Sequence, residues 1–127
     1  MKVLLDTHLM LWWQANNPRL PSQLPTLLEQ VDIVFFSQAS LWEIAIKVSL
    51  GKLQLDLDCF TANISAQGFE WLSIRNNHLL TVATLPQIAD HRDPFDRLLV
   101  AQSKAESLLL FTVDKRLAVY GDMVRIL

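Results

Sequence analysis

The chain begins with K-V-L-L-D-T-H-L-M-L-W-W at residues 2–13, and this stretch already indicates the class of fold. Residues 2–5 form a short apolar run that ends at Asp6, a pattern typical of a buried strand. A helix is expected to follow at residues 8–15 and to stop before Pro18. A buried strand followed directly by a helix is typical of α/β proteins.

The same alternation continues along the rest of the chain. Further strands are expected at residues 33–36, 70–74, 108–112 and 124–126. Further helices are expected at residues 22–30, 38–50 (capped by Ser37), 58–67 (with Asp58 as the cap), 77–84, 93–106 and 115–119. The strands lack polar alternation, which indicates a parallel sheet covered on both faces. We therefore expect a three-layer α/β fold with about five short strands.

Length and composition limit the function classes. A chain of 127 residues with 51% hydrophobic content fits one domain over residues 1–127, and excludes a two-domain enzyme or a disordered chain. The formal charge of −2 implies no broad basic surface. The single cysteine, Cys59, excludes a disulfide framework and a cysteine-based metal site. No signal peptide or membrane span is evident, so a cytoplasmic protein is expected.

Acidic residues stand where a parallel sheet places its ligands, beyond the carboxyl ends of the strands. Asp6 directly follows the first expected strand, and Asp114 follows the fourth by two residues. Glu43 lies on the helix after the second strand. Asp93 and Asp96 open the helix before the fourth strand. We expect these acids to share one edge of the sheet.

Gathered carboxylates require a counter-charge. Two of them about 4 Å apart repel by about 1–4 kcal/mol at effective dielectric constants of about 80 to 20. A hard divalent cation such as Mg²⁺ or Mn²⁺ relieves this repulsion with oxygen ligands. The histidines His8, His78 and His91 lack the spacing of a zinc site. The pattern therefore favours a magnesium or manganese site.

Each acid also has a structural explanation. Asp93 is well placed as a helix cap because Pro94 follows it. Asp114 could be a cap as well, and Asp6 could be a turn residue. Asp96 has the weakest structural explanation of these acids.

Glu43 and Lys47 are four residues apart and could form a simple surface pair. Apolar residues cover most of their helix: Leu41, Ile44, Ala45 and Val48 on one face, and Trp42, Ile46 and Leu50 on most of the rest. A helix this apolar is expected to be buried on most sides. Glu43 is therefore expected to face a cleft.

Four stretches together resemble a known family. They are V-L-L-D-T-H-L-M-L-W-W at residues 3–13, S-x-A-S-L-W-E-I-A-I-K-x-S-L-G-K-L at 37–53, H-R-D-P-F-D-R-L-L-V-A-Q at 91–102, and F-T-V-D at 111–114. In order and spacing they resemble PIN-domain proteins of the VapC-like toxin group over essentially the whole chain. The resemblance implies a metal-dependent endoribonuclease that acts as the toxin of a type II toxin–antitoxin pair, with a cognate antitoxin as partner and a homodimeric state.

The resemblance also implies roles for particular residues. Asp6, Glu43, Asp96 and Asp114 would be catalytic and would bind Mg²⁺ or Mn²⁺, with Asp93 as a further candidate ligand. The hydroxyls of Thr7 and Thr112 would hold the acids by hydrogen bonds. His8 departs from the Asn or Ser that many PIN proteins carry there, so its role stays open. The implied chemistry is hydrolysis of RNA by a metal-activated water.

Basic residues near these acids are candidate phosphate contacts: Lys47, Arg92, Arg97, Lys104, Lys115 and Arg116. The adjacent Trp12 and Trp13 cannot both point inward from one helix, so one is expected to line a groove for an antitoxin helix or a dimer interface. The alternative is a phosphoreceiver-type domain or a non-catalytic PIN-like binding domain. A receiver would carry paired acids after the first strand, whereas Asp6 is followed by Thr7.

Overall fold

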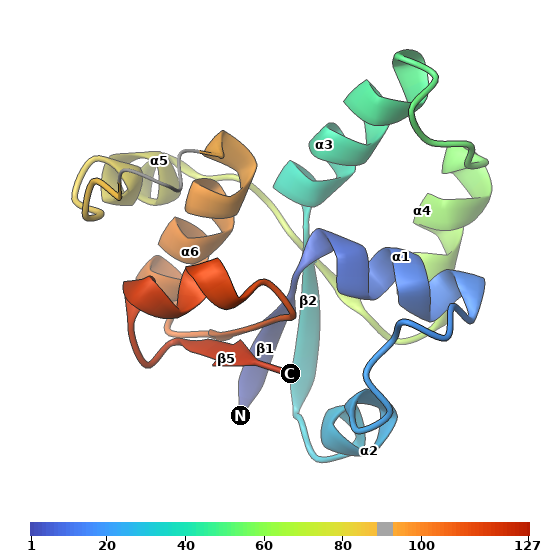
Figure 1. Ribbon diagram of the computed structural model, residues 1–127, viewed down its shortest axis with the longest axis horizontal. Coiled ribbons are helices and arrows are strands. Elements are labelled where there is room, and N and C mark those ends of the chain that lie inside the picture. Colours follow the sequence, from blue (N-terminus) through green and yellow to red (C-terminus); the bar gives the residue numbers. More distant parts are fainter. Residues whose placement is uncertain (89–92) are drawn as a thin grey trace.

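A parallel sheet organises the computed structural model, which describes residues 1–88 and 93–127 (Figure 1). The strands are β1 (Lys2–Leu5), β2 (Ile33–Ser37), β3 (Glu70–Leu72), β4 (Leu109–Thr112) and β5 (Val124–Ile126). Within the described ranges they form a 5-stranded sheet in the order β3-β2-β1-β4-β5, and every neighbouring pair is parallel. The expected sheet is confirmed, with β1 at its centre.

Helices cover both faces of the sheet. They are α1 (Thr7–Ala15), α2 (Leu24–Glu29), α3 (Gln38–Ser49), α4 (Leu57–Ala66), α5 (Asn76–Val82), α6 (Pro94–Glu106) and the 3₁₀ helix η1 (Lys115–Tyr120). Figure 1 shows α1 and α4 on one side of the sheet and α6 on the other. Val3 and Leu5 pack in the core with α1 and α4, whereas Leu4 packs in the core with α6. Two cores explain why β1 is apolar without alternation.

The structure corrects some expected boundaries. The helix expected at residues 58–67 begins one residue earlier, because Asp56 rather than Asp58 is its cap and accepts a hydrogen bond from the Cys59 N–H at 3.1 Å. Asp58 lies in the first turn, where its charge suits the helix dipole. The strand expected at 70–74 ends at Leu72, where its pairing with β2 ends.

Ser37 was expected to cap the following helix, and the structure confirms it. Its hydroxyl accepts a hydrogen bond from the Ala39 N–H at 2.9 Å and donates one to Gln102 Oε1 at 2.5 Å. The second bond ties the start of α3 to α6 across the sheet edge. Within the described residues, no helix is both long and apolar enough to cross a membrane.

Candidate active site

Asp6 stands at the carboxyl end of the central strand and caps α1. Its backbone is extended, Oδ1 accepts a hydrogen bond from the Thr7 N–H at 2.6 Å, and Oδ2 accepts one from the Thr112 hydroxyl at 2.5 Å. The residue is 4% exposed. Burial raises the pKa of the Asp6 carboxyl, and the bond from Thr112 and the nearby His8 only partly oppose that shift. A buried carboxylate in this state is stabilised by a cation.

Thr112 joins Asp6 to the segment that carries Asp114. Its hydroxyl donates to Asp6 and accepts from the Asp114 N–H at 3.0 Å. The Thr7 hydroxyl was expected to hold an acid, but it donates to Ser40 Oγ at 2.7 Å. Only the backbone N–H of Thr7 donates to Asp6. A hydroxyl therefore holds an acid at Thr112, whereas the Thr7 hydroxyl ties α1 to α3.

Glu43 points inward from α3, at 9% exposure. Lys47 Nζ donates to Glu43 Oε2 at 3.1 Å, and the Glu43 charge helps to raise the pKa of the buried Asp6. Glu43 is buried, as its place on an apolar helix indicated, and the expectation that it faces a cleft stays a prediction. The expectation that its helix is buried on most sides is wrong, since Trp42 is 56% exposed and Leu50 is 61% exposed.

Asp93 and Asp96 open α6 in different roles. Asp93 is exposed, and its Oδ1 accepts hydrogen bonds from the N–H groups of Phe95 at 2.9 Å and Asp96 at 3.0 Å. This is the capping role that the sequence suggested. Asp96 is half-buried one turn further along. The charges of both acids act to raise the pKa of Arg116, so all three belong to one electrostatic cluster.

Arg116 donates hydrogen bonds to Asp114 from both its side chain and its backbone. Nε donates to Oδ1 at 3.1 Å, Nη2 donates to Oδ2 at 2.8 Å, and the backbone N–H donates to Oδ1 at 3.0 Å. The two side-chain hydrogen bonds and the charge of Asp114 raise the pKa of the Arg116 guanidinium. Asp114 therefore caps η1 and forms an ion pair at the same time.

The acids follow the sheet edge as neighbours rather than as one tight group. Glu43 acts on Asp6, and Asp93 and Asp96 act on the Arg116 that binds Asp114. Two of the acids are paired with basic side chains. Lys47 holds Glu43, and Arg116 holds Asp114. Across residues 1–88 and 93–127, no group of three or more His, Cys, Asp or Glu side chains is close enough together to hold a metal ion. The residue types nevertheless suit Mg²⁺ or Mn²⁺, because these cations prefer carboxylate oxygens and the buried Asp6 supplies one such group.

The expected phosphate contacts fall into different environments. Arg97 is 9% exposed, and its Nη1 donates to the Pro86 carbonyl at 2.8 Å and to the Tyr120 hydroxyl at 3.1 Å. This burial corrects the expectation for Arg97, which serves the packing of the chain rather than a phosphate. Lys104 and Lys115 are exposed, and Arg92 lies outside the described residues.

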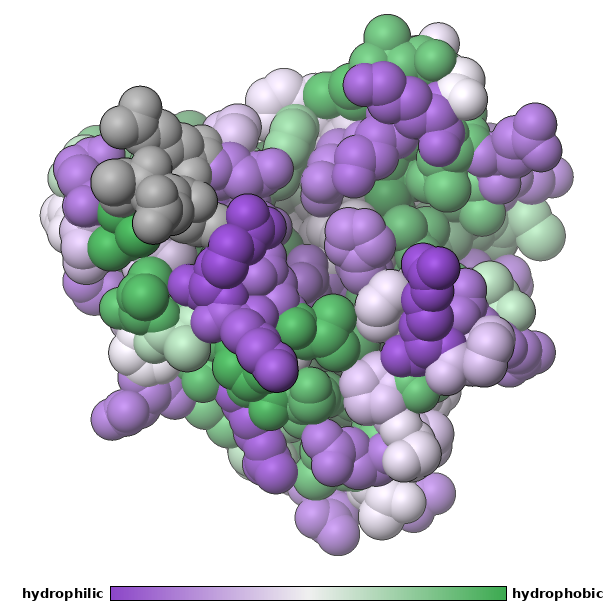
Figure 2. Space-filling model, viewed as in Figure 1, coloured by the Kyte–Doolittle hydropathy of each residue, from purple (hydrophilic) through white to green (hydrophobic). Residues whose placement is uncertain are grey.

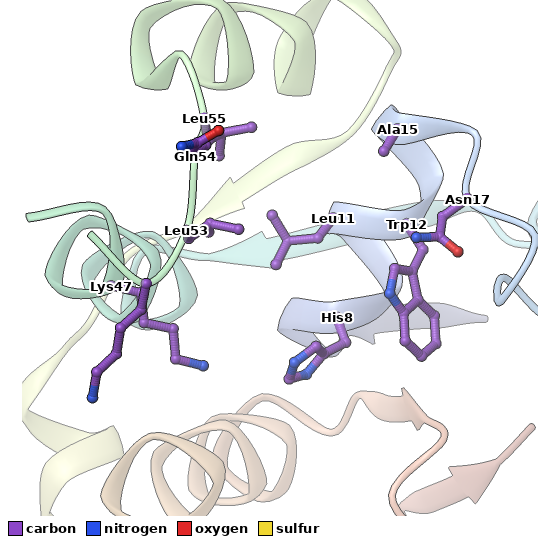
Figure 3. Close-up of a pocket in the computed structure, with 10 residues that line it drawn as sticks. His8, Leu11, Trp12, Ala15, Asn17, Lys47, Leu53, Gln54 and Leu55 are labelled. Atoms are coloured by element: carbon purple, nitrogen blue, oxygen red, sulfur yellow. The ribbon is translucent and has the colours of Figure 1, made fainter. Parts of the chain in front are cut away.

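A pocket of about 450 Å³ opens beside the acids, between α1 and the segment after α3 (Figure 3). Trp12, Leu11 and Leu53 contribute to its apolar wall. His8 and Lys47 reach its rim, and the ring centroids of His8 and Trp12 are 5.9 Å apart. Hydrophobic side chains gather over the same region in Figure 2.

Both adjacent tryptophans are partly buried against the same core, so they do not divide into one inward and one outward ring as expected. Trp13 packs edge-on against Phe69, with ring centroids 5.7 Å apart, and lines a separate pocket. Trp12 lines the pocket that Lys47 reaches. The occupant of the pocket stays a prediction. Two further residues escaped notice in the sequence: Ser40, the partner of Thr7, and Lys52, on the pocket wall. Ser40 stands three residues before Glu43 on the same helix, a spacing that could have revealed it.

Comparisons with known proteins find chains of similar sequence and of similar fold. The chain is 28% identical over 124 residues to Ribonuclease VapC22 of Mycobacterium tuberculosis, covering 91% of this chain and 88% of that protein. A chain in the crystal structure of VapBC2 from Rickettsia felis, bound to a DNA fragment from its promoter, superposes with a TM-score of 0.74 at 15% identity, covering 100% of this chain and 98% of that chain. A chain of the DNA-bound VapBC structure from Salmonella typhimurium gives a TM-score of 0.67 at 17% identity, covering 100% and 97%.

The order of the acids along the chain and the parallel sheet beneath them point to one family. The family model described as "PIN domain" matches residues 3–122, which is nearly the whole chain. The strand ends that carry Asp6 and Asp114 both lie inside that match. The chain therefore belongs to the PIN domain family.

Proposed function

We propose that the protein is a Mg²⁺- or Mn²⁺-dependent endoribonuclease and the toxin of a type II toxin–antitoxin pair. The observation that carries the proposal is the buried Asp6 carboxylate, which Thr112 links to Asp114 at the edge that also bears Glu43. The similarity to Ribonuclease VapC22 supports the reaction class. The fold is the one that the sequence resemblance implied.

The proposed mechanism is hydrolysis of a phosphodiester by water. When bound, the divalent cation lowers the pKa of a water molecule and neutralises charge that develops on the phosphate oxygens. Asp6, Asp96 and Asp114 would hold the cation, and Thr112 keeps the Asp6 carboxylate in a fixed orientation. Glu43 would orient the attacking water through its carboxylate oxygens. Because external water attacks, the products would end in a 5′-phosphate and a 3′-hydroxyl.

A cognate antitoxin is the proposed partner, and the cytoplasm is the proposed compartment. The fold is shared with chains from VapBC complexes, which supports a protein partner. The apolar pocket beside the acids, with Trp12 on its wall, is a candidate contact for such a partner. A homodimer is part of the same proposal.

Activity should depend on the metal and on Asp6. We expect the purified chain to cleave RNA with Mg²⁺ or Mn²⁺ and to lose this activity in excess EDTA. Asp6→Asn should lose activity by orders of magnitude, because the amide is a much poorer ligand for a hard cation. Gel analysis of end-labelled RNA measures cleavage, and phosphatase treatment of the fragments identifies their ends.

The matched control is Asp58→Asn, which removes an exposed carboxylate on α4. It should cleave RNA at the rate of the original chain. Full cleavage in EDTA would exclude the metal mechanism. Metal binding without any cleavage would instead favour the alternative of a non-catalytic or phosphoreceiver-type domain.

A further inference from the structure

Two basic side chains flank the central acid, one on each side along the sheet edge. Asp6 follows β1 at the centre, Lys47 lies on α3 after the neighbouring β2, and Arg116 lies on η1 after β4 on the other side. Lys47 Nζ is 3.1 Å from Glu43 Oε2, and Arg116 Nη2 is 2.8 Å from Asp114 Oδ2. Each cation thus occupies an oxygen of a candidate metal ligand.

In each pair the cation lies further outward than the carboxylate. The Lys47 and Arg116 side chains are 39% and 64% exposed, whereas those of Glu43 and Asp114 are 12% and 24% exposed. Ion pairs with an exposed partner contribute little to stability and exchange readily. The carboxylates therefore stay at the site when the pairs open, while the cations can turn outward.

A divalent cation would compete with Lys47 and Arg116 for the carboxylate oxygens of Glu43 and Asp114, and it carries twice the charge of either side chain. If these carboxylate oxygens held the cation, the ammonium of Lys47 and the guanidinium of Arg116 would each lose an acceptor. Phosphate oxygens are the natural replacement, since arginine binds them in bidentate fashion and lysine binds them as a compact charge. A strand of RNA passing the acids would bring such oxygens to both sides.

We propose that Lys47 and Arg116 are phosphate-binding residues that become more available when metal binds, each paired with a candidate ligand in the metal-free protein. This inference rests on the proposed function and adds a coupling to it. Metal binding then creates part of the RNA-binding surface in addition to the catalytic centre. The metal-free protein would hold RNA weakly, with its cations engaged internally.

Salt dependence of RNA affinity tests the coupling, because each phosphate contact on a single strand contributes about −0.7 to the slope of log affinity against log salt. The probe is a labelled oligoribonucleotide, titrated in Ca²⁺ and in EDTA, with its integrity checked on a gel. Lys47→Gln and Arg116→Gln should each make the slope shallower by about 0.7 in Ca²⁺ and by clearly less in EDTA. Arg116→Lys, which keeps the charge, should largely restore the Ca²⁺ slope.

The comparison variant is Lys115→Gln, next to Arg116 and exposed. Its effect on the slope should be the same in Ca²⁺ and EDTA. If Lys47→Gln and Arg116→Gln reduced the slope equally in Ca²⁺ and in EDTA, both residues would be ordinary phosphate contacts. If neither variant changed the slope in either condition, the two ion pairs would be purely structural. Either result overturns the inference, while RNA cleavage by the original chain with Mg²⁺ would leave the proposed function standing. A chain that neither binds metal nor cleaves RNA would overturn both.

Discussion

Asp6 lies in surroundings that act in opposite directions on the charge of its carboxyl group. It is almost fully buried, it is held as a hydrogen-bond acceptor by Thr7 and Thr112, and the charge of Glu43 acts on it. Burial is the largest influence and raises the pKa of its carboxyl. The folded, metal-free protein therefore bears a cost for keeping Asp6 ionised.

Neutralising Asp6 should stabilise the metal-free protein near pH 7. Its folded pKa is raised above its unfolded value, so the folded chain gains stability on protonation and loses it as pH rises from the unfolded pKa through the folded pKa. Asp6→Asn removes this pH-dependent loss of stability and keeps a carbonyl oxygen that can accept from the Thr7 N–H. Urea unfolding in EDTA should show a more stable variant at pH 7, with the gain shrinking as pH falls through this window.

Asp122→Asn, at an exposed position outside the helices and strands, serves as the reference and should show little change across the same pH range. A variant at Asp6 that is less stable than the original chain at every pH would mean that the carboxylate is needed as a structural acceptor. Burial would then not be the dominant influence on this residue.

Asp93 and Asp96, at the start of α6, have different structural environments. Asp93 satisfies two free N–H groups at the helix start, which is sufficient reason for an oxygen-bearing side chain at this position. Asp96 lies inside the helix and closer to the cluster around Arg116 and Asp114. The helix therefore separates a capping acid from a candidate ligand by a single turn.

Substitutions at these two positions should separate stability from activity. Asp93→Ser keeps a capping oxygen and should retain both stability and most RNA cleavage, whereas Asp93→Ala should lose about 1 kcal/mol of unfolding free energy. Asp96→Ser should lose cleavage by orders of magnitude with little loss of stability. Unfolding curves and cleavage rates at saturating Mn²⁺ measure both properties. Equal losses of activity in the two serine variants would make Asp93 a ligand as well.

The molecule as a whole leaves large apolar side chains uncovered around the start of α6, next to Asp93 and Asp96. On α5, Leu79 is 51% and Leu80 is 72% exposed, and Trp42 of α3 is 56% exposed beside Phe95. A pocket of about 250 Å³ lies among Trp42, Leu79 and Phe95. Contiguous exposed apolar surface of this kind is typical of a protein interface.

The expected homodimer can therefore be tested through this surface. Leu79→Glu and Leu80→Glu should shift the protein from dimer to monomer in sedimentation velocity, because a charge at the centre of an apolar contact is costly. Val119→Glu, at an apolar position on η1 with 56% exposure, is the control and should leave the dimer intact. If the unsubstituted protein were monomeric at all concentrations, the proposed homodimer would be wrong.

Much of the architecture was predictable because it depends on local pattern. Short apolar runs such as residues 2–5 indicate buried parallel strands, and acids placed directly after such runs must lie at their carboxyl ends. The capping roles of Ser37 and Asp93 were also predictable, since a cap is a contact between close neighbours in sequence. The exact cap of α4 was missed because Asp56 and Asp58 are both suitable and only the backbone path selects one.

Side-chain direction and partner choice required the tertiary structure. The apolar pattern of α3 suggested burial on most sides, yet Glu43 points inward while Trp42 is exposed, because the sheet packs against only part of the helix. Arg97 looked like a phosphate contact, but it is buried against Pro86 and Tyr120. The order of residues alone establishes the sheet, its ligand edge and the kinds of side chain present there. Which side chains meet depends on contacts between distant segments, such as Thr112 with Asp6, and such contacts exist only after the chain has packed.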